Sequence, residues 1–186
     1  MKLPYSWDNY SDQPYQLKDK NYKKTMRKKE FKSILKTILI SLFILPLSIL
    51  AMPFVKRKEI KSNEFFCIGA DYQREPNLSI ELLEELHVER VLLRFKLWEM
   101  DTLNDLKDFI LKLENKKITL KILQDRENVE DLNLLQRNLE TIFSELSLHV
   151  DIFEIGSTIN RAKWGFFSVD EYNKFFQVAY DLKTTK

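Results

Sequence analysis

The sequence is poor in the residue types on which many functional sites depend. With one cysteine, a single chain cannot form an internal disulfide, and two well-separated histidines exclude a histidine-rich metal site. Three glycines leave no G-x-G-x-x-G or P-loop pattern, so no nucleotide phosphate site is expected. The 30 Lys and Arg nearly balance the 28 Asp and Glu, so the overall charge indicates no polyelectrolyte partner. We therefore expect no cofactor and no metal, in a chain whose 186 residues make one or two domains.

What the sequence does have is a basic segment followed by a long uncharged one. Residues 18–36 contain two acids and nine cations, which are Lys18, Lys20, Lys23, Lys24, Arg27, Lys28, Lys29, Lys32 and Lys36. Residues 37–55 contain no charged side chain. A helix of that length is roughly 28 Å long, close to the ~30 Å hydrocarbon core of a bilayer. Lys36 can reach the headgroups, and membrane helices tolerate a kink at Pro46. We predict a transmembrane helix over 37–55, with the lipid bilayer as its partner.

Two other interpretations of residues 37–55 fit less well. A cleaved signal peptide has a short amino-terminal region and an apolar stretch of about 7–15 residues, whereas here over thirty residues precede a longer stretch. A buried helix of a soluble domain would normally show a polar face. Nine cations before the segment outnumber five after it, between Lys56 and Arg74, which places the N-terminus in the cytoplasm. The C-terminal domain then lies outside the cell membrane, in the periplasm if the cell is bacterial.

The predicted helix divides the chain into regions. Residues 1–36 are predicted to be a basic cytoplasmic tail, largely disordered, because residues 1–17 show neither a helical nor a strand period. A basic cluster beside an anionic leaflet gains about 1 kcal/mol per cation, so we expect lipid and no nucleic acid as its partner. Residues 56–62 are predicted to form a linker, and residues 63–186 a folded domain.

From residue 63 onward, apolar runs alternate with amphipathic stretches. Four strands are predicted, over 65–70, 90–95, 118–123 and 150–155. Helices are predicted from Ile80 to Leu86 after a cap at Asn77 or Ser79, from Leu103 to Leu113, from Val129 to Leu146, and from Tyr172 to Ala179. Thr102 with Asp105, and Ser168 with Glu171, have the spacing of capping boxes.

The strands begin near 65, 91, 118 and 150, a repeat of 26 to 32 residues that is typical of βαβ units in a parallel sheet. A complete eight-stranded barrel needs about 250 residues. This domain has about 124 (186 − 62). We therefore predict an α/β fold of four βα units, either half of a TIM barrel or a small open sheet, preceded by one transmembrane helix.

The fourth unit favours the barrel. Residues 151–165, DIFEIGSTINRAKWG, resemble strand four of the glycoside hydrolases built on (β/α)8 barrels, where the strand runs into an E-x-G-N-E-x-N-like end. Weaker resemblances link Gly69–Tyr72 to the end of strand one, Arg94–Trp98 to strand two, and Leu123–Asp125 to the end of strand three. The resemblance covers about residues 65–182. The resemblance implies a glycosidase-like half-barrel that binds envelope polysaccharide.

The chain departs from this family at the catalytic positions. Where the family has an Asn-Glu pair that carries substrate contact and the acid/base, this chain has Ser157-Thr158. A threonine hydroxyl cannot protonate a leaving glycosidic oxygen. Retaining hydrolysis needs a second carboxylate about 5–5.5 Å from the first, which the family carries at the end of strand seven. Glu154 lies four residues before the acid/base position. We assign no catalytic residue and expect the chain to be inactive alone.

Seven residues are predicted to line a substrate site, because barrel sites lie at the carboxyl ends of strands. They are Asp71, Arg94, Trp98, Gln124, Asp125, Asn160 and Trp164. The tryptophans would stack on sugar rings and the polar side chains would hydrogen-bond hydroxyls. The competing interpretation is that the tryptophans pack loops and the polar side chains pair with one another. Cys67 is predicted to be a buried strand residue, and neither His87 nor His149 has a catalytic-triad context.

Two functions stay open. In the first, the protein is a truncated glycosidase-like membrane protein that binds envelope glycan without hydrolysing it. In the second, it is a bitopic membrane protein whose α/β domain is a protein-interaction module without a sugar site. A half-barrel has open edges at its first and last strands. We therefore expect self-association, a separate second half-barrel or a broken reading frame, and an isolated domain that is dimeric or aggregation-prone.

Overall fold

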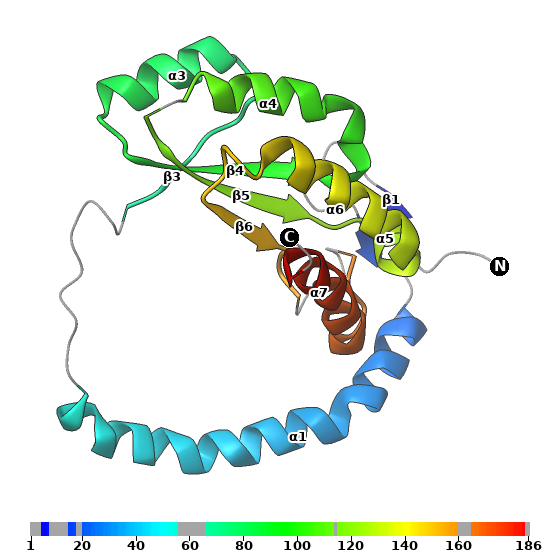
Figure 1. Cartoon of the computed structure of the whole chain (residues 1–186). Helices are drawn as coiled ribbons and strands as arrows, with labels where there is room; N and C mark the ends of the chain where they lie inside the picture. The colour runs from blue at the N-terminus through cyan, green and yellow to red at the C-terminus, as the bar shows by residue number, and fades with distance from the viewer. Residues whose placement is uncertain are drawn as a thin grey trace.

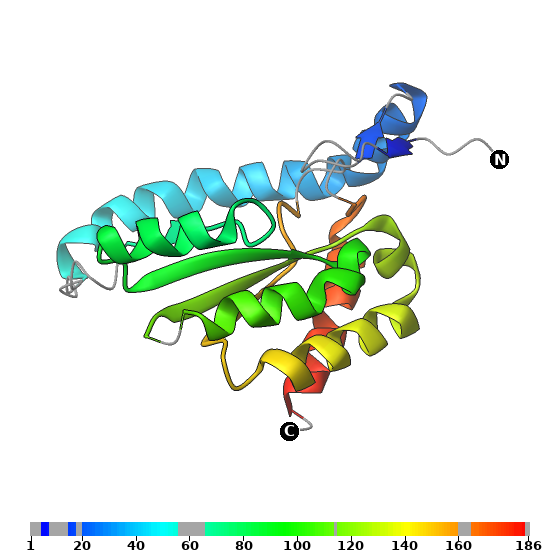
Figure 2. The same cartoon turned by 90° about the horizontal axis from the view of Figure 1, so that it is seen from above.

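The computed structural model of the chain describes residues 5–7, 15–17, 20–55, 66–113, 115–159 and 165–184 (Figure 1). A short antiparallel pair, β1 (Tyr5–Trp7) and β2 (Tyr15–Leu17), precedes the long helix α1 (Lys20–Ala51). The helix ends in a 3₁₀ turn, η1 (Met52–Phe54). The α/β domain is described from Phe66 onward (Figure 2).

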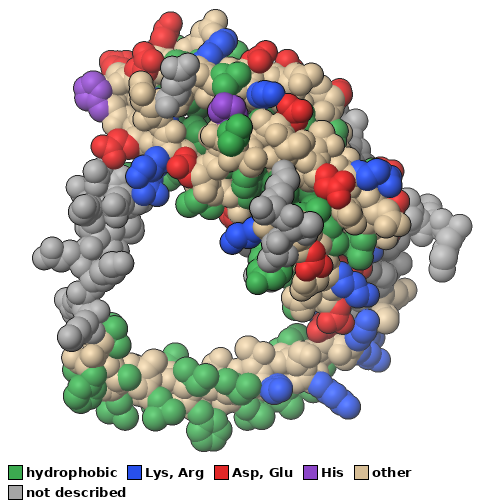
Figure 3. Space-filling view, in the orientation of Figure 1, with side chains coloured by type: hydrophobic (Ala, Val, Ile, Leu, Met, Phe, Trp, Pro, Cys, Tyr) green, Lys and Arg blue, Asp and Glu red, His purple; other side chains and the backbone are tan. Residues whose placement is uncertain are grey.

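Helix α1 and η1 contain the predicted transmembrane segment. The stretch from Arg27 to Phe54 is long and apolar enough to cross a membrane. Its apolar side chains are exposed, and Figure 3 shows them along α1, with Lys and Arg side chains toward its N-terminal end. The hydroxyls of Thr37 and Ser48 donate to backbone carbonyl oxygens of the preceding turn. These two polar groups are therefore satisfied inside the helix, as a lipid environment requires.

The basic segment is helical, which differs from the predicted disordered tail over 1–36. Helix α1 begins at Lys20, and β1 pairs with β2 farther toward the N-terminus. Lys and Arg are good helix formers, and a helix nucleated in the apolar stretch extends into them at little cost. Most of the basic run therefore belongs to the same helix as the apolar stretch.

The domain is built on a four-stranded parallel sheet in the order β3-β4-β5-β6 (Figure 1). The strands are β3 (Ile68–Gly69), β4 (Arg90–Lys96), β5 (Lys117–Leu123) and β6 (Ile152–Ile155). The predicted α/β fold with four parallel strands is confirmed. The prediction for Cys67 is wrong: it precedes the short edge strand β3 and its side chain is exposed, because an edge strand is packed on one side only.

Helices follow each strand. They are α3 (Pro76–Glu85), the 3₁₀ turn η2 (Leu97–Thr102) with α4 (Leu103–Leu111), α5 (Arg126–Glu130) with α6 (Leu132–Leu146), and α7 (Val169–Thr184). The predicted single helix from Val129 to Leu146 is broken at Asp131. This residue is extended, and its Oδ1 accepts hydrogen bonds from the N–H groups of Asn133 and Leu134. An aspartate in that conformation begins a new helix rather than continuing the old one.

The two predicted capping boxes have different outcomes. The Thr102 side chain makes no cap hydrogen bond, since its hydroxyl donates to the carbonyl oxygen of Glu99, so that prediction is wrong. Ser168 does cap α7, because its Oγ accepts a hydrogen bond of 3.2 Å from the N–H of Glu171. The Glu171 carboxylate accepts a hydrogen bond of 2.7 Å from the N–H of Phe167, and hydrogen bonding from the Ser168 backbone also lowers the pKa of Glu171, so the predicted cap at Ser168 is confirmed.

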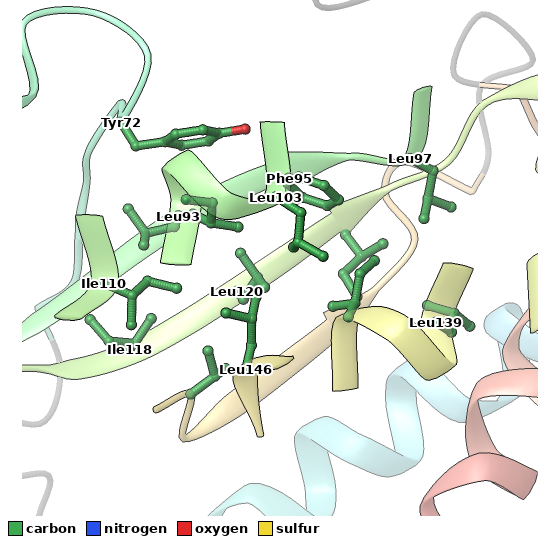
Figure 4. Packing of buried hydrophobic residues seen from close by; sticks show 14 of the residues in the cluster. Tyr72, Leu93, Phe95, Leu97, Leu103, Ile110, Ile118, Leu120, Leu139 and Leu146 are labelled. Carbon is green, nitrogen blue, oxygen red and sulfur yellow. The ribbon is translucent and has the colours of Figure 1, made fainter. Parts of the chain in front are cut away.

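The core lies between one face of the sheet and the helices. Six strand residues in direct register are at most 2 % exposed, namely Val91, Leu93 and Phe95 of β4 and Ile118, Leu120 and Ile122 of β5. Leucines of α4 and α6 pack against them (Figure 4). Figure 2 shows α4, α6 and α7 on one side of the sheet. The alternation of buried and exposed residues along β4 and β5 is therefore caused by one-sided helix packing.

The opposite face of the sheet carries charged side chains. Arg94, Lys121 and Glu154 are register neighbours across β4, β5 and β6, and Lys121 Nζ lies 2.8 Å from Glu154 Oε1. Open parallel sheets usually have both faces covered, whereas in a barrel the second face turns inward. Sequential strand order with helices on one face fits both a half-barrel and a small open sheet, so the half-barrel stays a prediction.

Candidate functional site at the carboxyl ends of the strands

The predicted site residues are distributed unevenly over the carboxyl edge of the sheet. Asp71 follows β3 and is exposed, while Trp98 lies in η2 after β4 and is half-buried. Gln124 and Asp125 follow β5 directly and are buried. Arg94 lies within β4, exposed on the charged face. The remaining two residues, Asn160 and Trp164, lie outside the described residues.

Gln124 joins the ends of β5 and β6. Its Nε2 donates to the carbonyl oxygen of Ser157 at 2.7 Å, and the N–H of Ser157 donates back to its Oε1 at 2.8 Å. The Gln124 carboxamide thus binds the Ser157 backbone through two hydrogen bonds, as a backbone peptide group of a longer β5 would do. With the side chain 2 % exposed, these bonds give Gln124 a structural role.

Asp125 is the N-cap of α5 and part of a buried polar chain. Its Oδ1 accepts hydrogen bonds from the N–H of Asn128 at 3.2 Å and from Asn128 Nδ2 at 2.6 Å. Asn128 Oδ1 in turn accepts from Asn138 Nδ2 at 2.8 Å, which connects α5 to α6. Burial raises the pKa of Asp125, although the hydrogen bonds from Asn128 act in the opposite direction. The carboxylate positions a helix start rather than pointing into an open site.

Substitution of Asp125 separates its charge from its capping function. We expect Asp125→Ala to lower the free energy of unfolding by about 1–2 kcal/mol, and Asp125→Asn, which keeps the acceptor, to lose much less. The folded pKa lies above the ordinary 3.8, so the native state binds the proton more tightly than the unfolded state. The contribution of Asp125 to stability therefore falls as pH rises from about 3.8 through the folded pKa. Urea unfolding of the detergent-solubilised chain across this range measures it, and an unchanged pH slope in Asp125→Asn would contradict the assignment.

A buried arginine with several hydrogen-bonding partners joins α5 to α7 near the strand ends. Arg126 makes a two-pronged ion pair with Glu171, with Nη1–Oε2 and Nη2–Oε1 distances of 2.8 and 2.9 Å. Its Nε donates to Glu130 Oε1 at 2.8 Å, and its guanidinium carbon lies 4.1 Å from the ring centre of Phe167. Burial by itself raises the pKa of Glu171, but hydrogen bonds from Arg126 and from the N–H of Phe167 outweigh it and hold that pKa below its ordinary value.

A second cluster lies at the ends of β3 and β4. Tyr72 is buried, and its hydroxyl lies 3.0 Å from Thr102 Oγ1. Gln73 Nε2 donates to Glu99 Oε2 at 2.8 Å, and Glu99 Oε1 lies 3.0 Å from Lys96 Nζ. Asp71 Oδ1 accepts from the N–H of Gln73 at 2.9 Å, which closes a local turn. These polar groups stabilise the turn after β3, and sugar contact by Asp71 or Trp98 stays a prediction.

The end of β6 has an unusual backbone. Gly156 and Thr158 both have left-handed conformations, with φ of 75° and 49°. A β-branched residue rarely adopts such a φ, so the backbone of Thr158 is strained. Ser157 Oγ lies 3.1 Å from Thr158 Oγ1, so the two hydroxyls pair with each other. No described group of three or more His, Cys, Asp or Glu side chains is placed to hold a metal ion.

Beside β6 the surface is hollowed into an apolar groove of about 570 Å3. Phe143 of α6, Ile152 and Phe153 of β6, and Phe176 and Tyr180 of α7 line it. Ile152, Phe176 and Tyr180 are 50 %, 42 % and 51 % exposed. Among the residues that the structure describes, β6 pairs with β5 alone, so its outer edge is open next to the groove. The open edge is predicted from the sequence, whereas the groove is not, because its lining comes from α6, β6 and α7, which are distant in the chain.

The other edge of the sheet also exposes apolar side chains. Leu78 and Leu82, one turn apart on α3, are 46 % and 47 % exposed, and Phe66 and Ile68 at β3 are 69 % and 39 % exposed. We refer to these four residues as the apolar ridge. The periodicity of α3 predicted its buried residue Leu83, whereas the outward-facing leucines have no signal of their own in the sequence.

In comparisons with protein-family models, with curated proteins and with solved structures, this chain gives no match.

Proposed function

We propose that this protein is a single-pass membrane protein whose α/β domain is a protein-interaction module. The proposal rests on the apolar groove, because this groove lies directly beside the open edge of β6. An open strand edge offers a row of backbone hydrogen-bonding groups, and an adjacent apolar surface accepts the side chains of an added strand. The same place in the domain thus supplies both requirements for binding an extended polypeptide segment.

The partner that we propose is a second copy of this chain. One edge of the domain has the groove and the other has the apolar ridge, so β3 and α3 of one copy can pack beside β6 and α7 of another. Two copies anchored in one membrane enter it in the same chain direction. That orientation suits parallel pairing of β3 with β6, which continues the strand direction of the sheet. Contact at both edges would close the pair around a two-fold axis.

Binding of envelope glycan at the strand ends is the competing proposal. Two of its seven residues, Gln124 and Asp125, are buried with their side chains hydrogen-bonded inside the domain, which favours the interaction module. Retardation of the solubilised chain in a polysaccharide-containing gel, lost in both Trp98→Ala and Trp164→Ala, would favour glycan binding instead.

Photo-crosslinking tests the interaction module. We expect a photoreactive phenylalanine analogue at position 176, within the groove, to give a product of twice the chain mass of 22.3 kDa in native membranes. Arg137, on the exposed face of α6, is the control position and is expected to give no product. A product with a different protein would support the module and overturn self-association. The absence of any product at 176 would overturn the module.

The natural cysteine reports the orientation of the chain in the membrane. Cys67 is exposed and is the one cysteine in the sequence. If nine cations hold the N-terminal side in the cytoplasm, a membrane-impermeant maleimide is expected to label Cys67 in intact cells. Labelling that appears only after permeabilisation would reverse the proposed orientation, and Cys67→Ser is the matched control for specificity.

A further inference from the structure

Three leucines are exposed at the amino ends of the strands, in the loops or at the helix end that precede them. Leu86, between α3 and β4, is 62 % exposed, and Leu111, at the end of α4, is 39 % exposed. Leu148, between α6 and β6, is 92 % exposed. A single exposed leucine is ordinary on a protein surface, but here three lie at the same end of the sheet. Leu111 and Leu148 line the same hollow, of about 370 Å3, so these two are close in space.

This end of the domain is also where the chain arrives from α1. Strand β3 is parallel to the other three, so the segment that precedes it enters at the amino ends of the strands. Phe66, just before β3, is 69 % exposed. Ten residues, 56–65, separate Val55 from Phe66. Such a segment spans at most about 36 Å, so an anchored domain stays near the bilayer surface.

The charges at this end nearly cancel. The described cations are Arg90, Lys112, Lys116 and Lys117, and the described acids are Glu85, Glu89 and Asp151. Lys116 Nζ donates to the carbonyl oxygen of Val88 at 2.8 Å, and Asp151 Oδ2 accepts from the N–H of Ile118 at 2.7 Å, so both have partners within the domain. Binding of an anionic headgroup at this end would therefore yield little favourable electrostatic energy. Any membrane contact made here comes from the apolar side chains.

We infer that the amino-end loops dock on the bilayer and insert Leu86, Leu111 and Leu148 among the headgroups. Insertion of a few apolar side chains is weak alone, but the tether holds the domain at a high local concentration. Docking in this orientation turns the carboxyl ends of the strands away from the membrane. The inference rests on the membrane anchor of the proposed function, and does not depend on which polypeptide binds the groove.

Quenching by brominated lipid tests the contact. The full chain carrying Cys67→Ser and Leu148→Cys is labelled with an environment-sensitive fluorophore and reconstituted into phosphatidylcholine vesicles. Brominated acyl chains are expected to reduce its emission by about twofold relative to ordinary lipid. A label at Glu127→Cys, exposed on α5 at the opposite end of the strands, is expected to be unaffected. Adding Leu86→Ser and Leu111→Ser to the Leu148 reporter should weaken the quenching.

Each other outcome has a definite meaning. Equal emission changes at 148 and 127, or no change at 148, would overturn docking by this end. Quenching that requires anionic lipid and disappears in about 0.5 M salt would overturn the apolar basis of the contact. Flotation of the vesicles checks the anchor separately, since a chain that does not float with them overturns both the anchor and the inference. Quenching without crosslinking at position 176 would retain the inference and overturn the interaction module.

Discussion

Arg126→Ala is expected to lower the free energy of unfolding by about 3 kcal/mol. The side chain of Arg126 is 10 % exposed and that of Glu171 is 28 % exposed, so removal of the guanidinium leaves a half-buried carboxylate without its charge partner. The same substitution removes hydrogen bonds to Glu130 and to the carbonyl oxygen of Gly165. Urea unfolding of the detergent-solubilised chain, followed by tryptophan fluorescence, measures the loss.

Two control variants show whether the two-pronged geometry matters. Arg126→Lys keeps the charge but cannot bond both carboxylate oxygens and Gly165 together, so an intermediate loss of about 1–2 kcal/mol is expected. Lys107→Ala removes an exposed ion pair with Glu145 and should leave the unfolding midpoint unchanged. Equal losses in Arg126→Ala and Lys107→Ala would show that the contact between α5 and α7 is not a principal source of stability.

The pair also predicts a dependence of stability on pH. The folded pKa of Glu171 lies below its ordinary 4.5, so the unfolded state binds the proton more tightly than the native state. The stability that Glu171 contributes is therefore present above about 4.5 and lost as pH falls through the lower folded pKa. Glu171→Gln should flatten this part of the stability curve.

Gly156→Ala is expected to cost about 2–3 kcal/mol, because two penalties act together. The φ of Gly156 is 75°, a conformation in which a Cβ approaches the backbone. A Cβ built there lies 3.2 Å from Phe166 Cε2, and Phe166 is held in place by ring contacts with Tyr172 and Phe175. The aromatic cluster cannot move without disturbing the packing of α7.

Gly69→Ala is the matched control, since Gly69 is the last residue of β3 and Gly156 directly follows the last residue of β6. A Cβ on Gly69 meets nothing closer than the carbonyl oxygen of Leu92 at 3.9 Å, and the backbone there is not left-handed. A change within about 0.5 kcal/mol is expected. If both substitutions cost the same, the tight turn after β6 would not be the reason for glycine at 156.

The parts of the fold that were predicted correctly are those that depend on residues close together in the sequence. The apolar stretch of α1 is predicted by its absence of charge, and β4 and β5 by alternating apolar residues. The break at Asp131 was missed, because the apolar period continues across it while the side chain caps a new helix. Cys67 was misplaced because the apolar run around it continues beyond the two residues that pair in β3.

The candidate site shows more clearly what the local sequence cannot predict. Gln124 and Asp125 are correctly predicted at the end of β5, but their hydrogen-bonding partners cannot be found in the local sequence. Gln124 bonds to Ser157 at a separation of 33 residues, and Arg126 bonds to Glu171 at a separation of 45. A residue type indicates that a polar group is present, whereas only the packed chain shows whether that group faces solvent or another residue.

The sequence by itself determined the anchor-like helix, the α/β class and the parallel strands, since each follows from hydrophobicity over short segments. The tertiary structure alone decided that the predicted polar residues after β5 hold the domain together, and that the open surfaces are the groove, the ridge and the leucines of the amino-end loops. Those surfaces depend on how helices lie against the sheet. Helix packing angles arise from contacts between residues far apart in the chain, which no local pattern records.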